Sequence, residues 1–551
     1  MRWSLYVAAF VLTALFRFLT LGDGFPNDHY VYISGGWQML AGEWPTRDWV
    51  DPGLPLMFAV SAAAQAVFGK VLFAEAVLVS VAFGAGAALT AAAVLEVTGT
   101  LWIAALATLL EVVVFPRTYG YPKVLVYAAV FLCCARFVSR PGHWRAVLMA
   151  FAVVVAFLFR HDHGLFLGVG CALTILLAPD SGTLAQRSRT LALFVLAGLL
   201  MVAPYLLYVQ LNGGLPAYIR AGVDFSEREA ARQWHIWPAV FGDDKPFQSA
   251  LVYEFYAIPV LALIVLVAQR FGGPEGPPYV HGTDPPYVHR GLDPPSAHRI
   301  PQWSAHVIPA AIVALLANYY LVRDPLDTRV ADAIVPAVML GAWLAARAVQ
   351  ATRHRTAALG VLALSVALFG ASVSSAGSIV ENLDRTDVRR EWDHLPRLFM
   401  TRSAELHERF STHQIPTRAT LSLVPFFGYL DRCTADDHRL IVGGYLVELP
   451  FFAQRRFAGG MGYLGGSFGG DETERLTLLR LRTQVAPFAV IPSDYMVDLE
   501  GRFPRIVEYL RARYTKLADV HVTDELDVNV FVDTTLAPVG RDRDTGWPCF
   551  R

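Results

Sequence analysis

Ionisable side chains that could do chemistry occur in five short clusters between the apolar segments of the chain. The clusters are Asp28 with His29; Arg47, Asp48 and Asp51; Arg117 with Lys123; Arg160, His161, Asp162 and His163; and Arg323, Asp324, Asp327 and Arg329. A carboxylate can take a proton from a hydroxyl group, and arginine or lysine can hold a phosphate. Charges beside a bilayer are costly unless they are paired or line a wet cavity. Their recurrence therefore predicts one shared site.

Each cluster also has a structural interpretation. Asp28 could cap a helix, and Arg47 with Asp48 could form a surface ion pair. The i, i+2 spacing of 161–163 suits a strand or loop better than a helix face, so hydrogen-bonded loop groups are favoured there over a metal site. Residues 323–329 could cap two helices. The functional interpretation therefore depends on the clusters occurring together.

The amino-acid composition indicates whether the chain lies in a membrane or in water. Of the 551 residues, 54% are hydrophobic and 17% are charged, against roughly 25% charged in soluble domains. The chain is therefore expected to be a membrane protein. The formal net charge of −1 gives no basic surface for nucleic acid, which is not expected as a partner.

The apolar residues are concentrated before residue 380. One crossing takes about 20 apolar residues, which predicts an α-helical polytopic domain over 1–380 with about eleven spans. The ranges are 3–21, 72–97, 101–116, 124–139, 146–160, 164–179, 190–211, 251–269, 303–322, 330–347 and 356–376. The segment 54–69 is amphipathic and too short to cross, so an interfacial helix is expected there.

Arginines in the short loops predict the orientation. They gather at 136–145, 187–189 and 347–355, and basic short loops face the cytoplasm. The same alternation places loop 22–71, the other three clusters and the C-terminal region on the outer face.

The first outer loop resembles that of the polytopic GT-C glycosyltransferases, the group with the protein O-mannosyltransferases and the lipid A aminoarabinose transferases (families 39 and 83). The matching residues are Asp28, Tyr30, Tyr32, Gly42, Glu43, Pro45, Arg47, Asp48, Pro55 and Leu56. The segments RHDHGLF (160–166) and RDPLDTRVADAIVP (323–336) also resemble outer-face positions of this group. The resemblance covers most of 1–376.

Two residues depart from the family pattern. Many relatives have a lysine just before the Pro-Pro-Leu of this loop, where the present chain has Asp51, Pro52 and Gly53. The resemblance then requires another cation for the lipid phosphate, and Lys123, Arg117 and Arg160 are the nearest candidates. The second acid of the mannosyltransferase type is replaced by His29, so the substrate of those relatives is not transferred to this chain.

The resemblance implies a glycosyltransferase of the bacterial cytoplasmic (inner) membrane, with its active site and C-terminal domain outside. It would move a hexose or pentose from a polyprenyl-phosphate donor to an envelope acceptor, a glycan, lipid or protein, with inversion. Asp28 is the first choice for the general base, and Asp48 or Asp51 the next. Substrate and phosphate would be held by Arg47, Arg117, Lys123, Arg160, His161, Asp162, His163, Arg323, Asp327 and Arg329. Transfer with a divalent metal and transfer without one both occur among relatives.

Two other classes remain open. A transporter or flippase of lipid-linked intermediates would also have many spans, but its acids would be expected at mid-membrane. A non-catalytic envelope-assembly protein would use the C-terminal domain to bind a partner.

The region 381–551 reads as a soluble α/β domain. Helices are expected at 475–484 and 503–514, and strands at 440–449, 488–491, 521–523 and 528–532. The glycine-rich run 457–470 lacks the Lys-Ser/Thr ending of a phosphate loop, so a mobile loop over the membrane face is preferred. Cys433 and Cys549 could form a disulfide in an oxidising compartment.

Overall fold

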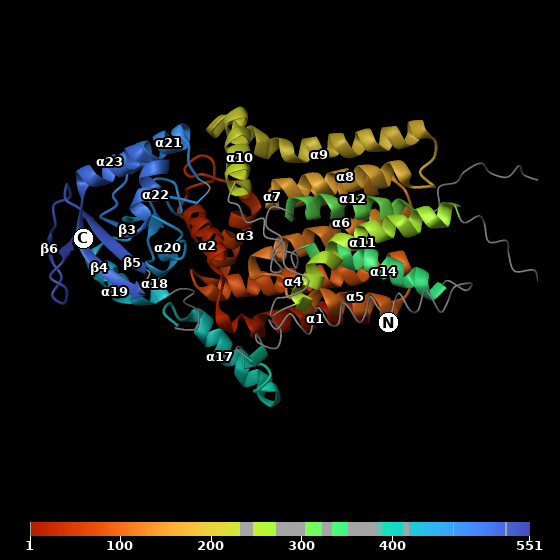
Figure 1. Cartoon of the computed structure of the whole chain (residues 1–551), viewed down its shortest axis with the longest axis horizontal. Coiled ribbons are helices and arrows are strands. Elements are labelled where there is room, and N and C mark those ends of the chain that lie inside the picture. Colours follow the sequence, from red (N-terminus) through yellow and green to blue (C-terminus); the bar gives the residue numbers. More distant parts are fainter. Residues whose placement is uncertain are drawn as a thin grey trace, which may run out of the picture.

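The computed structural model describes residues 2–231, 246–271, 304–321, 333–350, 383–384, 387–411, 418–466, 468–523 and 526–551. A bundle of roughly parallel and antiparallel helices forms one part of the molecule, and a domain with a β-sheet lies at one end of the bundle (Figure 1). The two parts correspond to the apolar and the ordinary regions of the sequence.

The helices of the bundle begin and end within the apolar segments of the sequence. They are α1 (Arg2–Leu19), α4 (Leu72–Thr98), α5 (Leu101–Val113), α6 (Tyr121–Ser139), α7 (His143–Phe159), α8 (His161–Leu177), α9 (Leu184–Asn212), α11 (Pro246–Phe271), α12 (Ser304–Leu321) and α14 (Ile334–Gln350). Small residues let them pack closely: a Cβ on Gly84 of α4 would lie 2.7 Å from the Phe10 carbonyl of α1.

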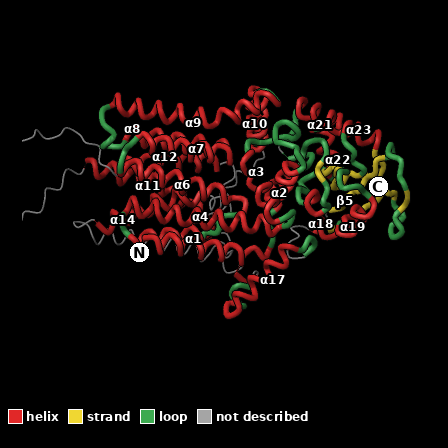
Figure 2. Tube along the Cα trace, turned by 180° about the vertical axis from the view of Figure 1, so that it is seen from behind, coloured by secondary structure: helices red, strands yellow, loops and turns green. Residues whose placement is uncertain are grey.

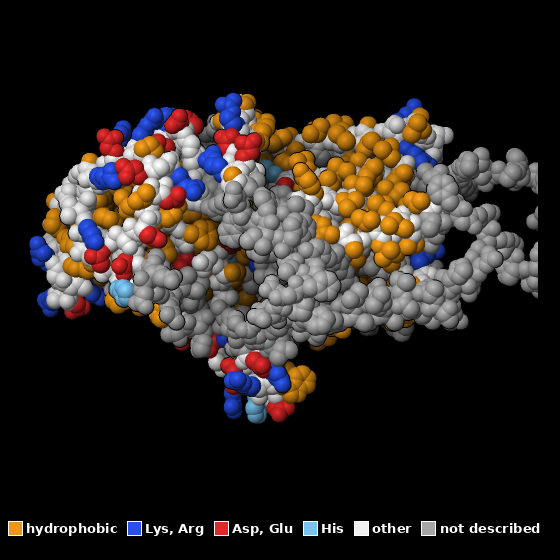
Figure 3. Space-filling view, viewed as in Figure 1, with side chains coloured by type: hydrophobic (Ala, Val, Ile, Leu, Met, Phe, Trp, Pro, Cys, Tyr) orange, Lys and Arg blue, Asp and Glu red, His pale blue; other side chains and the backbone are white. Residues whose placement is uncertain are grey.

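Large apolar side chains face outward from the bundle. On α9, Leu196 and Leu200 are 56% and 65% exposed, and apolar atoms cover much of the visible bundle surface while charges gather on the sheet domain (Figure 3). An apolar exterior of this kind is typical of helices that face lipid tails. The structure therefore supports membrane character for the bundle.

The expected number of spans is not supported. Helices occupy ten of the eleven predicted ranges, and 356–376 lies outside the described residues. Within the described part, four helices are both long and apolar enough to cross a membrane. They are α1, α4, α9 and the helical stretch Thr118–Ser139, which contains α6. Among the other apolar helices, α5 has 13 residues and α7, α8 and α14 have 17 each, which at 1.5 Å per residue is short for the ~30 Å hydrocarbon core.

Three amphipathic helices lie between the bundle and the sheet domain. They are α2 (Asn27–Leu40), α3 (Pro55–Phe68) and α10 (Leu215–Ala230), and α10 runs crosswise to α9 (Figure 1). On α10, Ile219 and Val223 are exposed while the helix also carries acids and arginines. This combination is typical of a helix in the membrane interface, as the sequence predicted for 54–69.

The sheet domain has five strands, β1 (Arg439–Val442), β2 (Arg456–Phe457), β3 (Phe488–Pro492), β4 (Tyr514–Thr523) and β5 (Leu526–Asp533), in the order β2-β1-β3-β5-β4. β1 is parallel to β2 and β3, whereas β5 is antiparallel to β3 and β4. A separate pair is formed by β6 (Gly540–Arg541) and β7 (Pro548–Cys549). Four of the strands overlap the predicted ones, although β1 ends at residue 442 because Gly443 and Gly444 start a turn.

Helices cover both faces of this sheet (Figures 1 and 2). The helices after residue 390 are α17 (Leu395–His407), α18 (Arg418–Ser422), α19 (Val424–Cys433), α20 (Leu449–Phe452), α21 (Asp471–Thr483), α22 (Tyr495–Arg502) and α23 (Pro504–Arg513), with a 3-10 turn at Trp392–His394. Two other 3-10 turns lie in the bundle region, at Thr20–Asp23 after α1 and at Thr118–Gly120 before α6. Alternate strand residues face opposite sides: Ile441 and Ile491 pack in the core with α21 to α23, and Val442 and Val490 belong to the other core.

α17 connects the sheet domain with the side of the bundle. The Phe399 ring lies 4.7 Å from that of Phe18 in α1, and His407 stacks on Phe73 of α4 at 4.4 Å. The sheet domain is therefore held to the bundle by more than the chain that joins them.

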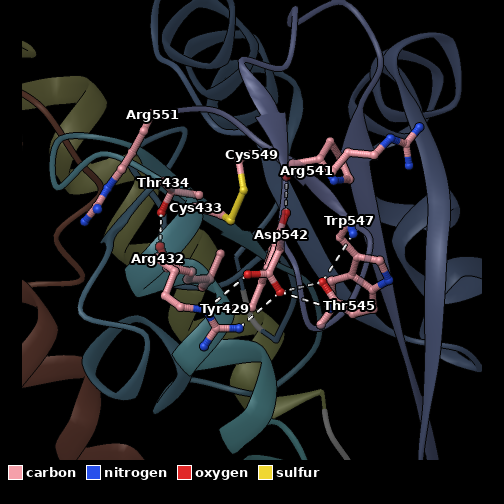
Figure 4. Close-up of a disulfide and its surroundings, with 12 residues drawn as sticks. Tyr429, Arg432, Cys433, Thr434, Arg541, Asp542, Thr545, Trp547, Cys549 and Arg551 are labelled. Carbon is pink, nitrogen blue, oxygen red and sulfur yellow. Dashed lines mark hydrogen bonds and ion pairs between the residues drawn. A yellow bond between two sulfur atoms is a disulfide. The ribbon is translucent and has the colours of Figure 1, made fainter.

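A disulfide joins Cys433, the last residue of α19, to Cys549 of β7 (Figure 4). Beside it, the Arg432 guanidinium donates to both Asp542 oxygens, each at 3.1 Å, and the Phe550 amide donates to the Cys433 carbonyl at 2.7 Å. The C-terminus is thereby fixed to α19.

Removal of the disulfide should destabilise the sheet domain. The bond spans 116 residues, and closing a loop of that size contributes about 2–5 kcal/mol. We expect Cys433→Ser with Cys549→Ser to lower the free energy of unfolding by that amount in chemical denaturation followed by fluorescence. The control Cys133→Ala removes a free thiol and should leave the transition of the sheet domain in place; an equal loss in the control would contradict the prediction.

Labelling can test which side of the membrane the sheet domain occupies. Residue 48 lies in the loop after α2, and residue 142 lies in the opposite loop between α6 and α7. In intact cells, a membrane-impermeant maleimide should label Asp48→Cys and not Gly142→Cys, and lysis should expose both. If only Gly142→Cys is labelled in intact cells, the orientation is opposite to the predicted one.

Candidate functional site

The loop between α2 and α3 is joined to the sheet domain by a partly buried ionic contact. Glu43 lies between Arg439 and Arg456 and accepts hydrogen bonds from both. Arg456 Nη1 donates to Glu43 Oε1 at 3.0 Å, and Arg439 Nη1 donates to Glu43 Oε2 at 3.1 Å. The Gln38 amide donates to the Phe457 carbonyl at 3.2 Å. Because these contacts fix α2 against β1 and β2, groups on α2 and groups of the sheet domain can share one site.

The glycine-rich run takes part in this contact. The Val50 amide donates to the Gly460 carbonyl at 3.0 Å. Gly460 has a φ of +73°, and a Cβ there would lie 2.6 Å from the Asp48 carbonyl. The sequence interpretation of a mobile loop over the membrane is therefore corrected: glycine is needed because two backbones approach closely, which favours a fixed joint.

Asp28 lies in the first turn of α2 and does not cap it. The N-cap is Pro26, without a side-chain cap, so the capping interpretation is wrong. The Asp28 carboxylate instead accepts a hydrogen bond from the Tyr445 hydroxyl. Tyr445 follows β1 in the sheet domain, and its side chain is 44% exposed. The Asp28 carboxylate is half-buried and accepts a hydrogen bond from a hydroxyl group. A general base must be within hydrogen-bond reach of the hydroxyl whose proton it takes.

His29, the residue after Asp28, points into the bundle. Its Nε2 lies 3.0 Å from Glu75 Oε2 of α4, and both side chains are buried. Ser61 of α3 donates to the other Glu75 oxygen, and Gln65 donates to Ser61 at 3.1 Å. This network fixes the relative positions of α2, α3 and α4, which gives His29 a positioning role.

A small pocket, with a cavity volume of about 20 Å³, lies where α2, α3, α6, α7 and α8 meet. Its walls are Tyr32, Leu54, Met57, Tyr119, Pro122, Lys123, Val126, Ala156, Phe159, Arg160 and His163. The lining thus combines two permanent cations with apolar and aromatic side chains. Such a lining suits an anionic head attached to an apolar chain.

The residues 161–163 begin α8 and send their side chains to different partners. His161 Nε2 lies 3.0 Å from the Tyr218 hydroxyl, Asp162 accepts from Arg160 Nε at 2.9 Å, and His163 Nδ1 lies 2.6 Å from the Tyr127 hydroxyl. They lie on a helix and not in the expected loop, because Arg160 already ends the preceding helix. Among the residues with described placement, no group of three or more His, Cys, Asp or Glu is arranged to hold a metal ion.

Arg47 and Asp48 form the exposed ion pair of the structural interpretation. Arg47 Nη2 lies 2.7 Å from Asp48 Oδ2, and the same carboxylate accepts from the Trp44 amide at 2.8 Å. Neither residue lines the pocket. Arg117 does not line it either; its guanidinium lies 4.6 Å from the ring of Tyr119, which does. The predicted Arg323, Asp327 and Arg329 lie outside the described residues.

Asp51 is a buried acceptor in the loop before α3. Its Oδ1 accepts from the amides of Gly53 and Leu54, both at 2.8 Å, and its Oδ2 from the hydroxyls of Tyr205 and Tyr218 at 3.4 and 3.3 Å. Burial raises the pKa of Asp51, against the opposing effects of these amides and of His161. The side chain holds the loop to α9 and α10, which is a structural role.

Three contributors to this site were not among the predicted residues. Glu75 could have been noticed as an acid near the start of an apolar span. Tyr218 and Tyr445 had no such signal, because a tyrosine in an amphipathic helix or after a strand is unremarkable by spacing.

Comparisons with known proteins add no assignment. No protein-family model matches the chain, and no curated protein matches it significantly.

Replacing Asp51 should separate its acceptor role from its charge. Asp51→Ala leaves the buried amides of Gly53 and Leu54 without an acceptor, at about 1–3 kcal/mol each, whereas Asp51→Asn keeps one acceptor oxygen. We expect thermal unfolding in detergent to show a clear loss for alanine and a small one for asparagine. An equal loss in both variants would contradict this role.

The raised pKa of Asp51 also predicts how the stability of the wild type relative to Asp51→Asn changes with pH. Because the pKa of Asp51 is raised on folding, the folded state binds more protons than the unfolded state above the ordinary pKa of an aspartate. The stability of the wild type relative to Asp51→Asn should therefore fall as the pH rises from about 4 through the folded pKa. A relative stability that increases over this range would contradict the raised pKa.

Proposed function

We propose that the protein is a membrane glycosyltransferase that moves a sugar from a polyprenyl-phosphate donor to an envelope acceptor, with inversion and with Asp28 as the general base. One observation supports this most directly. Tyr32 lines the pocket that contains Lys123 and Arg160, and Asp28 lies four residues earlier on α2. Residues four apart share a helix face, so the candidate base is one turn from the candidate phosphate pocket.

The donor would lie with its phosphate toward Lys123 and Arg160 and its prenyl chain along the apolar wall. Both side chains are permanent cations at neutral pH, and the ion pair with Asp162 at 2.9 Å orients the Arg160 guanidinium. Cations placed beside a leaving phosphate stabilise the charge that develops on it.

The reaction forms a bond between the acceptor oxygen and C1 of the sugar, while the bond from C1 to the phosphate oxygen breaks. The acceptor proton goes to the Asp28 carboxylate, and polyprenyl phosphate leaves. Attack from the face opposite the phosphate inverts C1 in one step, so no carboxylate needs to form a covalent intermediate. The sugar is a hexose or a pentose.

The proposed compartment is supported by one covalent bond and by the proposed chemistry. A disulfide between Cys433 and Cys549 is typical of proteins outside the cytoplasm, and lipid-linked sugars serve as donors where nucleotide sugars are absent. We place the sheet domain and the site on the outer face of a bacterial inner membrane. A GT-C arrangement with about eleven crossings remains part of this proposal.

Asp28→Asn tests the proposed base. The amide cannot accept the proton, so transfer should fall by about 10²–10⁴-fold. The assay measures radiolabelled sugar moved from a panel of polyprenyl-phosphate-linked pentoses and hexoses into an envelope fraction. Asp48→Asn is the matched control, because Asp48 lies in the exposed turn with Arg47 and should retain activity within a few-fold.

Two results would overturn the assignment. Full activity of Asp28→Asn would exclude Asp28 as the base. Movement of donor lipid across a bilayer without release of polyprenyl phosphate would instead indicate a flippase.

A further inference from the structure

The contact between Asp28 and Tyr445 depends on a turn that the sheet builds rigidly. The Gly443 amide donates to the Val490 carbonyl at 2.8 Å, and the Gly444 amide donates to the Leu464 carbonyl at 3.0 Å. Gly444 has a φ of +68°, and a Cβ there would lie 2.9 Å from Pro492 Cγ. Only glycine suits this close turn. The next residue, Tyr445, is thus presented to Asp28 by the backbone of the sheet.

The bond itself has the geometry of a catalytic encounter. The phenol is a six-membered ring with a hydroxyl, and this hydroxyl donates to Asp28, as an acceptor hydroxyl must before a general base removes its proton. The ring is 44% exposed, and it also contacts Tyr463 at 5.1 Å between ring centroids. The Tyr445 ring is therefore reachable from outside.

The two sides of Asp28 differ in chemistry. Toward the bundle, Tyr32 leads to the pocket with Lys123 and Arg160. Toward the sheet domain, the contact is with the hydroxyl of Tyr445. A donor phosphate fits the first side because of its cations, which leaves the second side for the group that brings a hydroxyl.

We propose that Tyr445 marks the acceptor subsite and that its hydroxyl occupies the place of the acceptor hydroxyl. The acceptor is a sugar ring, because a ring hydroxyl can replace the phenol while the sugar ring takes the place of the exposed Tyr445 ring beside the buried Tyr463. This inference rests on the proposed function. When no acceptor is present, Tyr445 keeps water from Asp28 and so limits hydrolysis of the donor, in which water would take the sugar and polyprenyl phosphate would leave.

Tyr445→Phe tests the subsite in the full-length protein. Tyr495→Phe is the matched control, since it also removes one hydroxyl of the sheet domain, a partner of the Gly466 amide at 3.2 Å, without a contact to Asp28. The first readout needs no substrate: carbodiimide coupling of an amine to Asp28, followed by mass spectrometry. We expect labelling of Asp28 to rise at least about three-fold in Tyr445→Phe and to stay unchanged in Tyr495→Phe; the general base must be reachable for such coupling.

The second readout is release of polyprenyl phosphate from the donor panel without acceptor. It should rise about five-fold or more in Tyr445→Phe alone, and added alkyl glycosides should then be glycosylated while serine- and threonine-containing peptides are not. Unchanged labelling and unchanged hydrolysis would overturn the subsite and leave the transferase assignment standing. Transfer to peptides would overturn the sugar acceptor. If no donor is cleaved by any form of the protein, the proposed function itself fails.

Discussion

Glu43 lies between Arg439 and Arg456, and its carboxylate is shared by two guanidinium groups of the sheet domain. Replacing one member of this partly buried group would leave a charge without its partner. The loss of folding free energy would then exceed the net stabilisation that the intact ion pair contributes. Around it, Trp49 packs edge to face on Phe58 and on Phe457 at centroid distances of 4.5 and 6.0 Å. The register between the first outer loop and the sheet depends on this contact, because the carboxylate can satisfy both arginines in only one relative position.

The candidate site depends on that register from two directions. α2 bears Asp28 and Tyr32 on one face, and the buried pair of His29 and Glu75 fixes this helix to the bundle. The sheet domain presents Tyr445 through the turn at Gly443 and Gly444, whose backbone amides are both hydrogen-bonded. Asp51 holds the loop beside them to α9 and α10. One short helix thus has its position set by the bundle below and by the sheet above.

The sequence predicted the helices well because each one is a nearly continuous apolar run, and it predicted the grouping of Lys123, Arg160 and His163 because alternate crossings bring every second loop to the same end. Among the described residues, four of the predicted crossings are long and apolar enough to span a membrane, and several others form helices of 13–17 residues. It assigned Asp48 and Asp51 to catalysis because residue type and proximity in sequence do not show hydrogen bonds. Tyr445 could not be found, because a contact over 417 residues leaves no periodic pattern.

The separation of these partners along the chain has a consequence for biosynthesis. α2 and Glu43 leave the ribosome well before the sheet domain, because their contacts to Tyr445 and Arg439 have sequence separations of 417 and 396 residues. Domains fold in order as they emerge, and contacts this distant in sequence form late. The bundle can therefore enter the membrane, and even meet lipid, while Asp28 still lacks its partner. A chain stalled before the sheet domain is synthesised would contain the bundle without the contacts of Glu43 and Asp28 to that domain.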